Sequence, residues 1–170
     1  MESLYAPWRN PYSQSNERSK EHGCSPQDCA FCVQLQADQD AQNFILKRTH
    51  HLAILFNRYP YNSGHLLIIP YQHVDSLDKL PVQARAELME LANASMLILQ
   101  EIIAPHGFNM GLNTGKAAGA GMPSHLHLHV LPRWHGDTNF LPTLGATKTI
   151  SVDLNGLYQL LLPKFQELTV

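Results

Sequence analysis

The sequence predicts an α+β fold, in which an antiparallel sheet of about five strands carries one long helix on one face and is followed by a C-terminal helix. Three short apolar runs, then one long segment with a 3.6-residue apolar period, then two more short runs lead to this prediction. The length of 170 residues and the hydrophobic content of 44% fit one domain with a sizeable core.

The first three strands are predicted from runs rich in apolar and β-branched residues, at 44–47, 52–56 and 65–69. A short polar connection over 48–50 joins the first two runs. A turn region over 57–64, rich in Asn, Ser and Gly, separates the second run from the third. These three strands come before the long helix.

The long helix is predicted to begin at Pro81, because proline suits the first helical turn, where its missing N–H is not needed. Pro105 and Gly107 end it. Its apolar face consists of Val82, Leu88, Leu91, Ala92, Met96, Leu99 and Ile102.

Two more strands, at 108–112 and 126–131, are predicted after this helix and are joined by a glycine-rich connection. The tail over 153–166 is predicted to be helical. Pro163 is expected to interrupt it, because proline removes a backbone hydrogen bond inside a helix. The sequence shows no internal repeat and no low-complexity segment.

Composition argues against several classes of function. The formal net charge of −2 gives no basic excess that would indicate a nucleic-acid partner. The apolar runs are far too short to cross a membrane, and no secretory signal is expected at the N-terminus. Three cysteines, two of them in Cys29-Ala30-Phe31-Cys32, suggest metal binding or redox chemistry instead of a disulfide framework. We therefore expect a cytoplasmic protein.

Three histidines, His125, His127 and His129, alternate with aliphatic residues. On an extended strand their imidazoles share one face, about 7 Å between neighbours. His125 and His129 would lie about 13 Å apart, too far to share one ion on a regular strand. Imidazole acts as nucleophile, proton carrier or metal ligand near neutral pH, so the pattern predicts a catalytic or metal-binding strand. A solvated edge strand is the plain alternative.

The loop before this strand, 111–121, contains four glycines. Glycine allows close backbone approach and positive φ values, so that successive N–H groups can converge on an anion. The loop lacks the Gly-Lys-Ser/Thr end of a Walker motif. Next to three histidines, we favour an oxyanion or phosphate cradle over a plain flexible loop. Lys116 and Arg133 could add positive charge to it.

The chain resembles the histidine triad (HIT) superfamily, whose pattern is His-φ-His-φ-His-φ-φ with φ apolar. The segment that begins at His125 fits this pattern fully. Leu55-Phe56-Asn57-Arg58 and the segment 63–73, with a further upstream histidine, also match. The resemblance covers roughly residues 29–134 and implies a HIT-like fold.

The flanking segments resemble the diadenosine tetraphosphate phosphorylase-like branch of this superfamily. The matching segments are Tyr5-Ala6-Pro7-Trp8-Arg9, Cys29-Ala30-Phe31-Cys32, Ala118-Gly119-Ala120-Gly121, Pro132-Arg133-Trp134 and Gly136-Asp137-Thr138-Asn139-Phe140. One departure is that Gly121 and Met122 stand where many triad hydrolases have Gln or Ser. Phosphate contacts there would fall more heavily on backbone amides.

The resemblance implies that His127 is the nucleophile, which attacks the α-phosphorus of a nucleotide and forms a nucleotidyl-histidine intermediate. His129 and His65 would donate hydrogen bonds to phosphate oxygens, although His65 could instead be a structural histidine. The implied substrate-binding residues are Asn57 at the ribose, Asn113 at ribose or phosphate, and Gly115, Gly119, Gly121 and Trp134. Tryptophan at this position could equally belong to the core or a dimer contact.

The resemblance also implies a structural zinc ion, bound by Cys29, Cys32, His73 and His125. Two thiolates and two imidazoles suit a closed tetrahedral site. No organic cofactor is expected, and Cys24 has no assigned role.

Together these features imply a nucleotidyl transferase or hydrolase acting on dinucleoside polyphosphates such as diadenosine tetraphosphate, with phosphate or water as the second nucleophile. The alternatives are a nucleoside phosphoramidase and, less favoured, a non-catalytic nucleotide-binding protein. The expected organisation is an irregular N-terminal segment (1–28), a histidine triad domain (29–140) and a C-terminal extension (141–170) packed on the same domain. A homodimer is expected from the resemblance.

Overall fold

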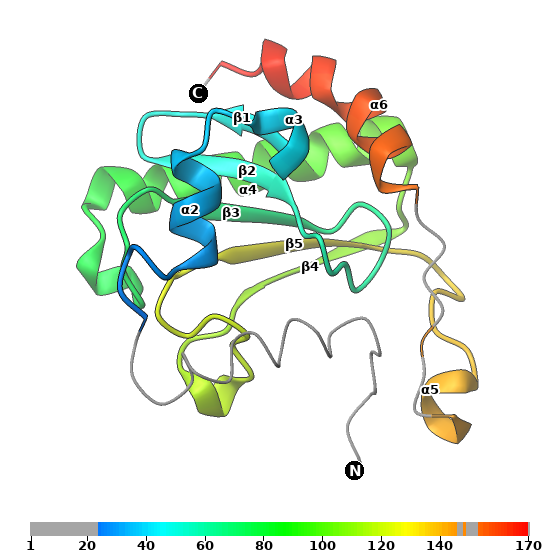
Figure 1. Cartoon of the computed structure of the whole chain (residues 1–170). Coiled ribbons are helices and arrows are strands. Elements are labelled where there is room, and N and C mark those ends of the chain that lie inside the picture. The colour runs from blue at the N-terminus through cyan, green and yellow to red at the C-terminus, as the bar shows by residue number, and fades with distance from the viewer. Residues whose placement is uncertain (1–23, 146–147, 149–152, 170) are drawn as a thin grey trace.

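A single antiparallel sheet lies at the centre of the computed structural model, which describes residues 24–145, 148 and 153–169 (Figure 1). Within these residues the strands are β1 (Ile45–Arg48), β2 (Leu52–Phe56), β3 (Leu66–Pro70), β4 (Gly107–Leu112) and β5 (Leu128–Arg133). Their order is β1-β2-β3-β5-β4, and all neighbouring pairs are antiparallel. The predicted α+β fold is therefore confirmed.

Helices and short turns surround the sheet. In the described residues they are α2 (Ala30–Gln36), α3 (Asp40–Asn43), η2 (Leu77–Lys79), α4 (Val82–Ile103), η3 (Lys116–Ala118), α5 (Leu141–Leu144) and α6 (Leu154–Glu167). The long helix α4 begins directly after Pro81, as predicted, and Ala104 ends it in the left-handed conformation with φ 43°. The Cys-x-x-Cys motif lies at the start of α2, a helix that the sequence patterns did not predict.

The C-terminal helix α6 runs straight through Pro163, so the predicted interruption is wrong. Proline inside a helix costs about 3 kcal/mol. Leu161 and Phe165, on either side of it, are both fully buried in the main core, and burying two such side chains offsets that cost. Tyr158 of the same helix donates a hydrogen bond from its hydroxyl to the carbonyl of Ile45. Packing against α4 and β1 therefore holds the helix together.

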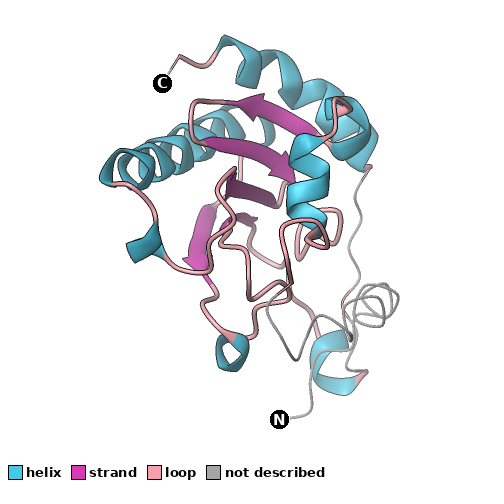
Figure 2. Ribbon diagram, turned by 60° about the vertical axis from the view of Figure 1, so that its left-hand side comes forward, coloured by secondary structure: helices cyan, strands magenta, loops and turns pink. Residues whose placement is uncertain are grey.

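The central strands β2 and β3 are buried on both faces. Their even-numbered side chains, such as Ile54 and Ile68, form the main core with α4 and α6. Their odd-numbered side chains, such as Leu55 and Leu67, pack with Leu35 of α2 on the opposite face. Figure 1 shows α4 behind the sheet and α2 in front of it, and Figure 2 shows the sheet between these two helices. Because side chains alternate along a strand, β5 directs Leu128 and Val130 to the main core and His129 to the α2 face.

Two expectations involve residues beyond this description. The predicted N-terminal segment 1–28 and its matching motif at 5–9 lie largely or wholly outside the described residues. Among the helices that are described, none has the length and apolar character needed to cross a bilayer.

Candidate active site and metal cluster

The histidine segment is only partly a strand. β5 begins at Leu128, two residues later than predicted, so His125 and His127 precede it. The Leu126 N–H donates to the carbonyl of Val74 at 2.6 Å, outside the sheet, whereas Leu128 pairs with β3. The rings of His127 and His129 remain together, with centroids 4.9 Å apart. The His125 ring instead lies against the thiols at the start of α2.

His127 is held in one tautomer. Its Nδ1–H donates to the backbone carbonyl of His125 at 2.8 Å, which leaves the lone pair on Nε2. The residue is 7% exposed, and burial lowers the pKa of its imidazole, so the ring is neutral near pH 7. A neutral imidazole with one nitrogen fixed and the other available has the form required of a nucleophile.

His129 is held by a chain of hydrogen bonds. The backbone N–H of Tyr61 donates to Nδ1 of His65 at 3.1 Å, so the His65 proton lies on Nε2. This Nε2–H donates to Nδ1 of His129 at 2.9 Å. The proton of His129 therefore lies on Nε2, which makes that atom a hydrogen-bond donor. His65 is 0% exposed, and its Nε2–H is directed at His129 and not into the described pocket lining, which differs from the expected direct contact with phosphate.

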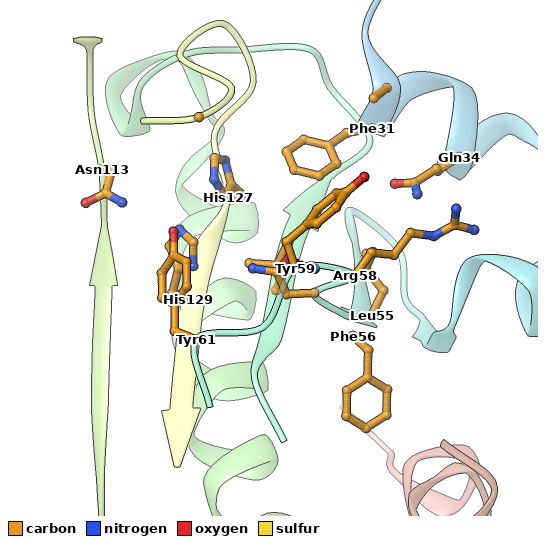
Figure 3. A pocket seen from close by; sticks show the side chains of 14 residues that line it. Phe31, Gln34, Leu55, Phe56, Arg58, Tyr59, Tyr61, Asn113, His127 and His129 are labelled. Atoms are coloured by element: carbon orange, nitrogen blue, oxygen red, sulfur yellow. Dashed lines mark hydrogen bonds between the residues drawn. The ribbon is translucent and has the colours of Figure 1, made fainter. Parts of the chain in front are cut away.

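His127 and His129 line a pocket of about 280 Å³ on the α2 face of the sheet (Figure 3). Tyr61 and Asn113 lie beside the histidines at one end of it. The other end is formed by Phe31 and Gln34 of α2 together with Arg58 and Tyr59, which follow β2. The pocket thus joins an imidazole-rich end to an aromatic end, an arrangement that suits a phosphate attached to a nucleoside.

The predicted substrate-binding residues divide into two groups. Asn57, Asn113 and Gly121 line the pocket. In the described structure, Gly115, Gly119 and Trp134 are outside its lining. The two loop glycines do adopt positive φ, 79° and 82°, as the glycine-rich loop predicted.

The Arg133 side chain does not line the described pocket. Its Nε donates to Oδ2 of Asp137 at 2.6 Å, and its NH1 group donates to Asn109. The suggestion that this side chain adds charge to a phosphate cradle is therefore wrong. The ion pair four residues apart holds Arg133 at the far end of β5.

Asp137 holds the turn between β2 and β3 (57–65) against the end of β5 through hydrogen bonds. The Asn62 side-chain amide donates to Oδ2 of Asp137 at 2.7 Å and to the carbonyl of Pro132 at 3.0 Å. The backbone N–H of Trp134 donates to the same carboxylate. The Arg133 guanidinium, helped by these donors, holds the pKa of Asp137 well below its usual range.

Gly64 allows the same turn to pack closely. Its φ is +73°, and an added Cβ would lie 2.8 Å from Cδ1 of Ile103 in α4. Only glycine fits this position without strain. This close contact lies directly before His65, and β3 begins at the following residue, Leu66.

Cys29, Cys32, His73 and His125 form a second, closed cluster, with all four ligand atoms within 4.8 Å of one another. Cys29 Sγ lies 3.2 Å from His125 Nδ1, and Cys32 Sγ lies 3.2 Å from His73 Nδ1. Zinc bonds of about 2.3 Å to sulfur and 2.1 Å to nitrogen place tetrahedral ligands roughly 3.4–3.8 Å apart. These two pairs are slightly closer than that range, and the separations within the cluster extend up to 4.8 Å, so the four atoms surround a space of about the size that a zinc ion needs. These residues could therefore bind a metal ion.

The protonation and hydrogen bonding of these four side chains also suit a bound metal ion. Burial raises the pKa of the Cys29 thiol to about 12 and, with the nearby His73 and His127 rings, lowers the pKa of His125 to about 4. A divalent cation would bind the thiolates and release their protons. His125 donates from Nε2–H to the carbonyl of Pro70 at 2.9 Å, which leaves Nδ1 as the ligand atom. Cys24 lies near this cluster, with Sγ 2.8 Å from Oγ of Ser124.

Phe31 stands between the metal cluster and the pocket. It lies inside the Cys-x-x-Cys motif, and its ring centroid is 5.0 Å from that of His127 and 5.7 Å from that of His125. Helix α2 and its N-cap residue Cys29 therefore supply both the two thiols and one wall of the pocket.

Sequence reasoning missed several pocket side chains, among them Phe31, Gln34, Tyr59 and Tyr61. Their positions carried a usable signal. Phe31 lies between two predicted metal ligands, and Tyr61 lies between the predicted Asn57 and His65. Residues enclosed by predicted site residues are natural candidates for the same site.

The fold, the paired histidines and the closed cluster agree with the result of family comparison: the HIT domain family model matches residues 38–136, and the chain belongs to this family. The predicted resemblance to the histidine triad superfamily is therefore confirmed. The chain is 33% identical over 150 residues to AP-4-A phosphorylase of Mycobacterium tuberculosis, covering 88% of this chain and 77% of that relative. It also resembles a Zn-bound histidine triad family protein from Mycobacterium smegmatis, with a TM-score of 0.67 and 25% identity over 84% of this chain and 96% of the other. A histidine triad nucleotide-binding protein of Sulfolobus tokodaii has the same fold, with a TM-score of 0.64 and 22% identity over 81% of this chain and 92% of that one.

Proposed function

We propose that this chain is a nucleotide-processing enzyme that cleaves dinucleoside polyphosphates such as diadenosine tetraphosphate, with inorganic phosphate as acceptor. The observation that carries the proposal is the fixed tautomer of His127 beside the donor His129 in one pocket. The choice of substrate is supported by the M. tuberculosis relative, whose name is AP-4-A phosphorylase. A relative in Schizosaccharomyces pombe is named bis(5′-nucleosyl)-tetraphosphatase [asymmetrical]; it is 28% identical over 93 residues, which cover 55% of this chain and half of the relative. Its name supports water as the alternative acceptor.

The proposed reaction has two displacements. First, Nε2 of His127 attacks the α-phosphorus, a P–N bond forms, and the P–O bond to the leaving nucleoside polyphosphate breaks. The Nδ1–H of His127 stays bonded to the His125 carbonyl, which stabilises the positive charge that develops on the ring. An oxygen of inorganic phosphate then attacks the same phosphorus, and the P–N bond breaks. Neutral His127 is restored, and the products from diadenosine tetraphosphate are ATP and ADP.

The neighbouring residues have supporting roles in this proposal. His129 donates from Nε2–H to a phosphoryl oxygen, and His65 keeps that tautomer in place. Asn57, Asn113 and Gly121 contact the ribose and phosphates from the pocket lining. Gly115 and Gly119 remain predicted parts of a phosphate cradle, and Trp134 remains a predicted contact to the nucleotide.

We further propose that the ion bound by Cys29, Cys32, His73 and His125 is a structural zinc, and that no organic cofactor takes part. Zinc would supply a cross-link between α2, the segment after β3 and the first triad histidine. The ligand set and the Zn-bound relative support this choice. The division at residues 28 and 140, a cytoplasmic location and a homodimer also remain proposals. For the dimer, the support is that β4 forms an edge of the sheet and exposes Met110.

Product analysis tests the proposed function. The purified chain is incubated with diadenosine tetraphosphate, with and without inorganic phosphate, and the nucleotides are separated by anion exchange. Phosphate-dependent ATP and ADP are expected. AMP and ATP without phosphate would make the chain a hydrolase, and turnover of adenosine phosphoramidate alone would make it a phosphoramidase. Nucleotide binding without turnover would leave a binding protein.

A further inference from the structure

Tyr61 lies in the pocket at the end that holds the histidines (Figure 3). Its ring stacks on that of His129, with centroids 5.8 Å apart and 18° between the planes. The same ring lies 4.6 Å from the His65 ring. The tyrosine thus forms one wall around the two histidines that are linked by a hydrogen bond.

The backbone at this tyrosine is fixed at several points. The Tyr61 N–H donates to Nδ1 of His65 at 3.1 Å, and its carbonyl accepts from Nζ of Lys148 at 2.9 Å. The next residue, Asn62, donates to Asp137 at 2.7 Å. A tyrosine side chain has only two rotatable bonds, so a fixed backbone and a stacked ring give its hydroxyl a defined position.

The Tyr61 hydroxyl extends beyond the stacked rings into the pocket. Figure 3 shows it directed along the His129 ring toward the space between Asn113 and His127, where the phosphate of a bound nucleotide would lie. A phenylalanine would stack on the histidines equally well. The oxygen therefore adds a polar group at the imidazole-rich end of the pocket. A phenol hydroxyl can donate one hydrogen bond there.

We propose that Tyr61 is a further catalytic residue, whose phenol O–H donates a hydrogen bond to a phosphoryl oxygen of the nucleotide while His127 attacks. This inference rests on the proposed function. The hydroxyl keeps its proton throughout, because the leaving group departs as a phosphate anion and the only bonds exchanged are P–O and P–N. Its contribution is to stabilise the charge on the phosphoryl oxygens in the transition state.

The test compares two conservative variants. Tyr61→Phe keeps the ring and its stacking and removes only the hydroxyl. We expect kcat for diadenosine tetraphosphate to fall about 10²-fold, the scale of losing one preorganised donor, with KM changed less than about threefold. Tyr71→Phe removes the same oxygen from a tyrosine that is exposed and outside the described pocket lining, and it should leave both constants unchanged. Thermal melting of each variant establishes that it is folded.

A third variant separates the hydroxyl from the ring. Tyr61→Leu should lower kcat at least as much as Tyr61→Phe. If Tyr61→Phe matches the wild type and only Tyr61→Leu is impaired, the ring alone matters and the assignment of the hydroxyl is overturned. A rise in KM at constant kcat overturns it too. If the wild type turns over no nucleotide substrate, the proposed function fails and this role falls with it, whereas an active wild type with an unchanged Tyr61→Phe overturns this role alone.

Discussion

His125 and His127 are two residues apart, yet they belong to regions of opposite character. His125 is enclosed with two thiols, and its Nε2–H donates to the carbonyl of Pro70, so Nδ1 is the nitrogen that faces the sulfurs. His127 lies against the pocket, and its Nδ1–H donates to the carbonyl of His125, so Nε2 is the available nitrogen. In both cases a backbone carbonyl accepts a hydrogen bond from one ring N–H, which fixes the tautomer and leaves the other nitrogen available. The comparison teaches that one sequence pattern can present imidazoles with opposite nitrogens available, which suits His125 to the proposed role of metal ligand and His127 to the proposed role of nucleophile.

The largest expected effect tests the pocket side of this comparison. His127→Ala removes the proposed nucleophile, and turnover should fall about 10⁴-fold or more, as when a covalent nucleophile is deleted from other enzymes. Metal content and the melting temperature should change little, because the cluster does not use this ring. Steady-state kinetics, metal analysis and thermal melting measure the three quantities. His50→Ala, at an exposed histidine in the turn between β1 and β2, is the matched control. Retained activity in His127→Ala would exclude the covalent mechanism.

The next effect tests the closed cluster. Cys29→Ser should reduce bound zinc well below one ion per chain and lower the free energy of unfolding by at least about 3 kcal/mol, since a buried charged set loses a partner. For a chain of this size that corresponds to a melting temperature roughly 6–12 °C lower. Cys24→Ser, which alters the nearby cysteine outside the four ligands, should keep its metal. Metal loss in Cys24→Ser as well would mean that the ligand set is wrongly assigned.

A smaller effect on stability is expected at the ion pair between Arg133 and Asp137, which holds the turn between β2 and β3 in place. Asp137→Asn should lower the free energy of unfolding by about 2 kcal/mol at pH 7, because it weakens hydrogen bonds to a buried carboxylate. The folded-state pKa of Asp137 is depressed, so its stabilisation is complete above the unfolded-state pKa near 4 and is lost as the pH falls toward the folded value. Urea unfolding at pH 7 and pH 3 should therefore show a smaller difference between variant and wild type at pH 3. An equal or larger difference in acid would contradict this account.

The smallest effect tests the boundary between the two regions. Phe31→Leu keeps an apolar side chain between the thiols but removes a ring that contacts both His127 and His125. We expect KM to rise about five- to tenfold, equivalent to roughly 1 kcal/mol of lost aromatic contact. Bound metal should remain at one ion per chain. Metal loss in this variant would show that the boundary residue belongs to the cluster as much as to the pocket.

Much of the arrangement of the pocket and the metal cluster could be predicted from the sequence, because the patterns that indicate it lie within short segments. Alternation of His125, His127 and His129 with aliphatic residues predicted a histidine-bearing strand, and the Cys-x-x-Cys spacing suggested a metal cluster. Family resemblance added His73 and the division of roles. The remainder depends on contacts between segments distant in sequence. The Val74 carbonyl accepts a hydrogen bond from the Leu126 N–H, so this residue does not pair within the sheet and β5 begins only at Leu128. No pattern within the strand reveals this contact.

Two further differences have the same origin. Arg133 looked available for phosphate because its charge is visible in the sequence, but its ion pair with Asp137 depends on the turn after β5. Pro163 carries a strong local signal against a helix, and only the burial of its neighbours in the folded core overrides that signal. Tyr61 had no distinctive pattern of its own, since stacking on His129 requires the fold to bring β5 beside β3.

The tight packing at Gly64 gives the turn before β3 less freedom to diversify in sequence than the glycine-rich loop before β5. A methyl group at Gly64 meets Ile103 and Pro132, so the turn that carries Tyr61 and His65 tolerates little change. In the glycine-rich loop, by contrast, the exposed residues 116–118 are outside the described pocket lining, and they lie between two glycines where an added Cβ would meet no atom within 4 Å. Selection for altered substrates should therefore gather substitutions in the 116–118 segment and leave the Gly64 turn unchanged. The reaction chemistry would be retained while the range of leaving groups evolves.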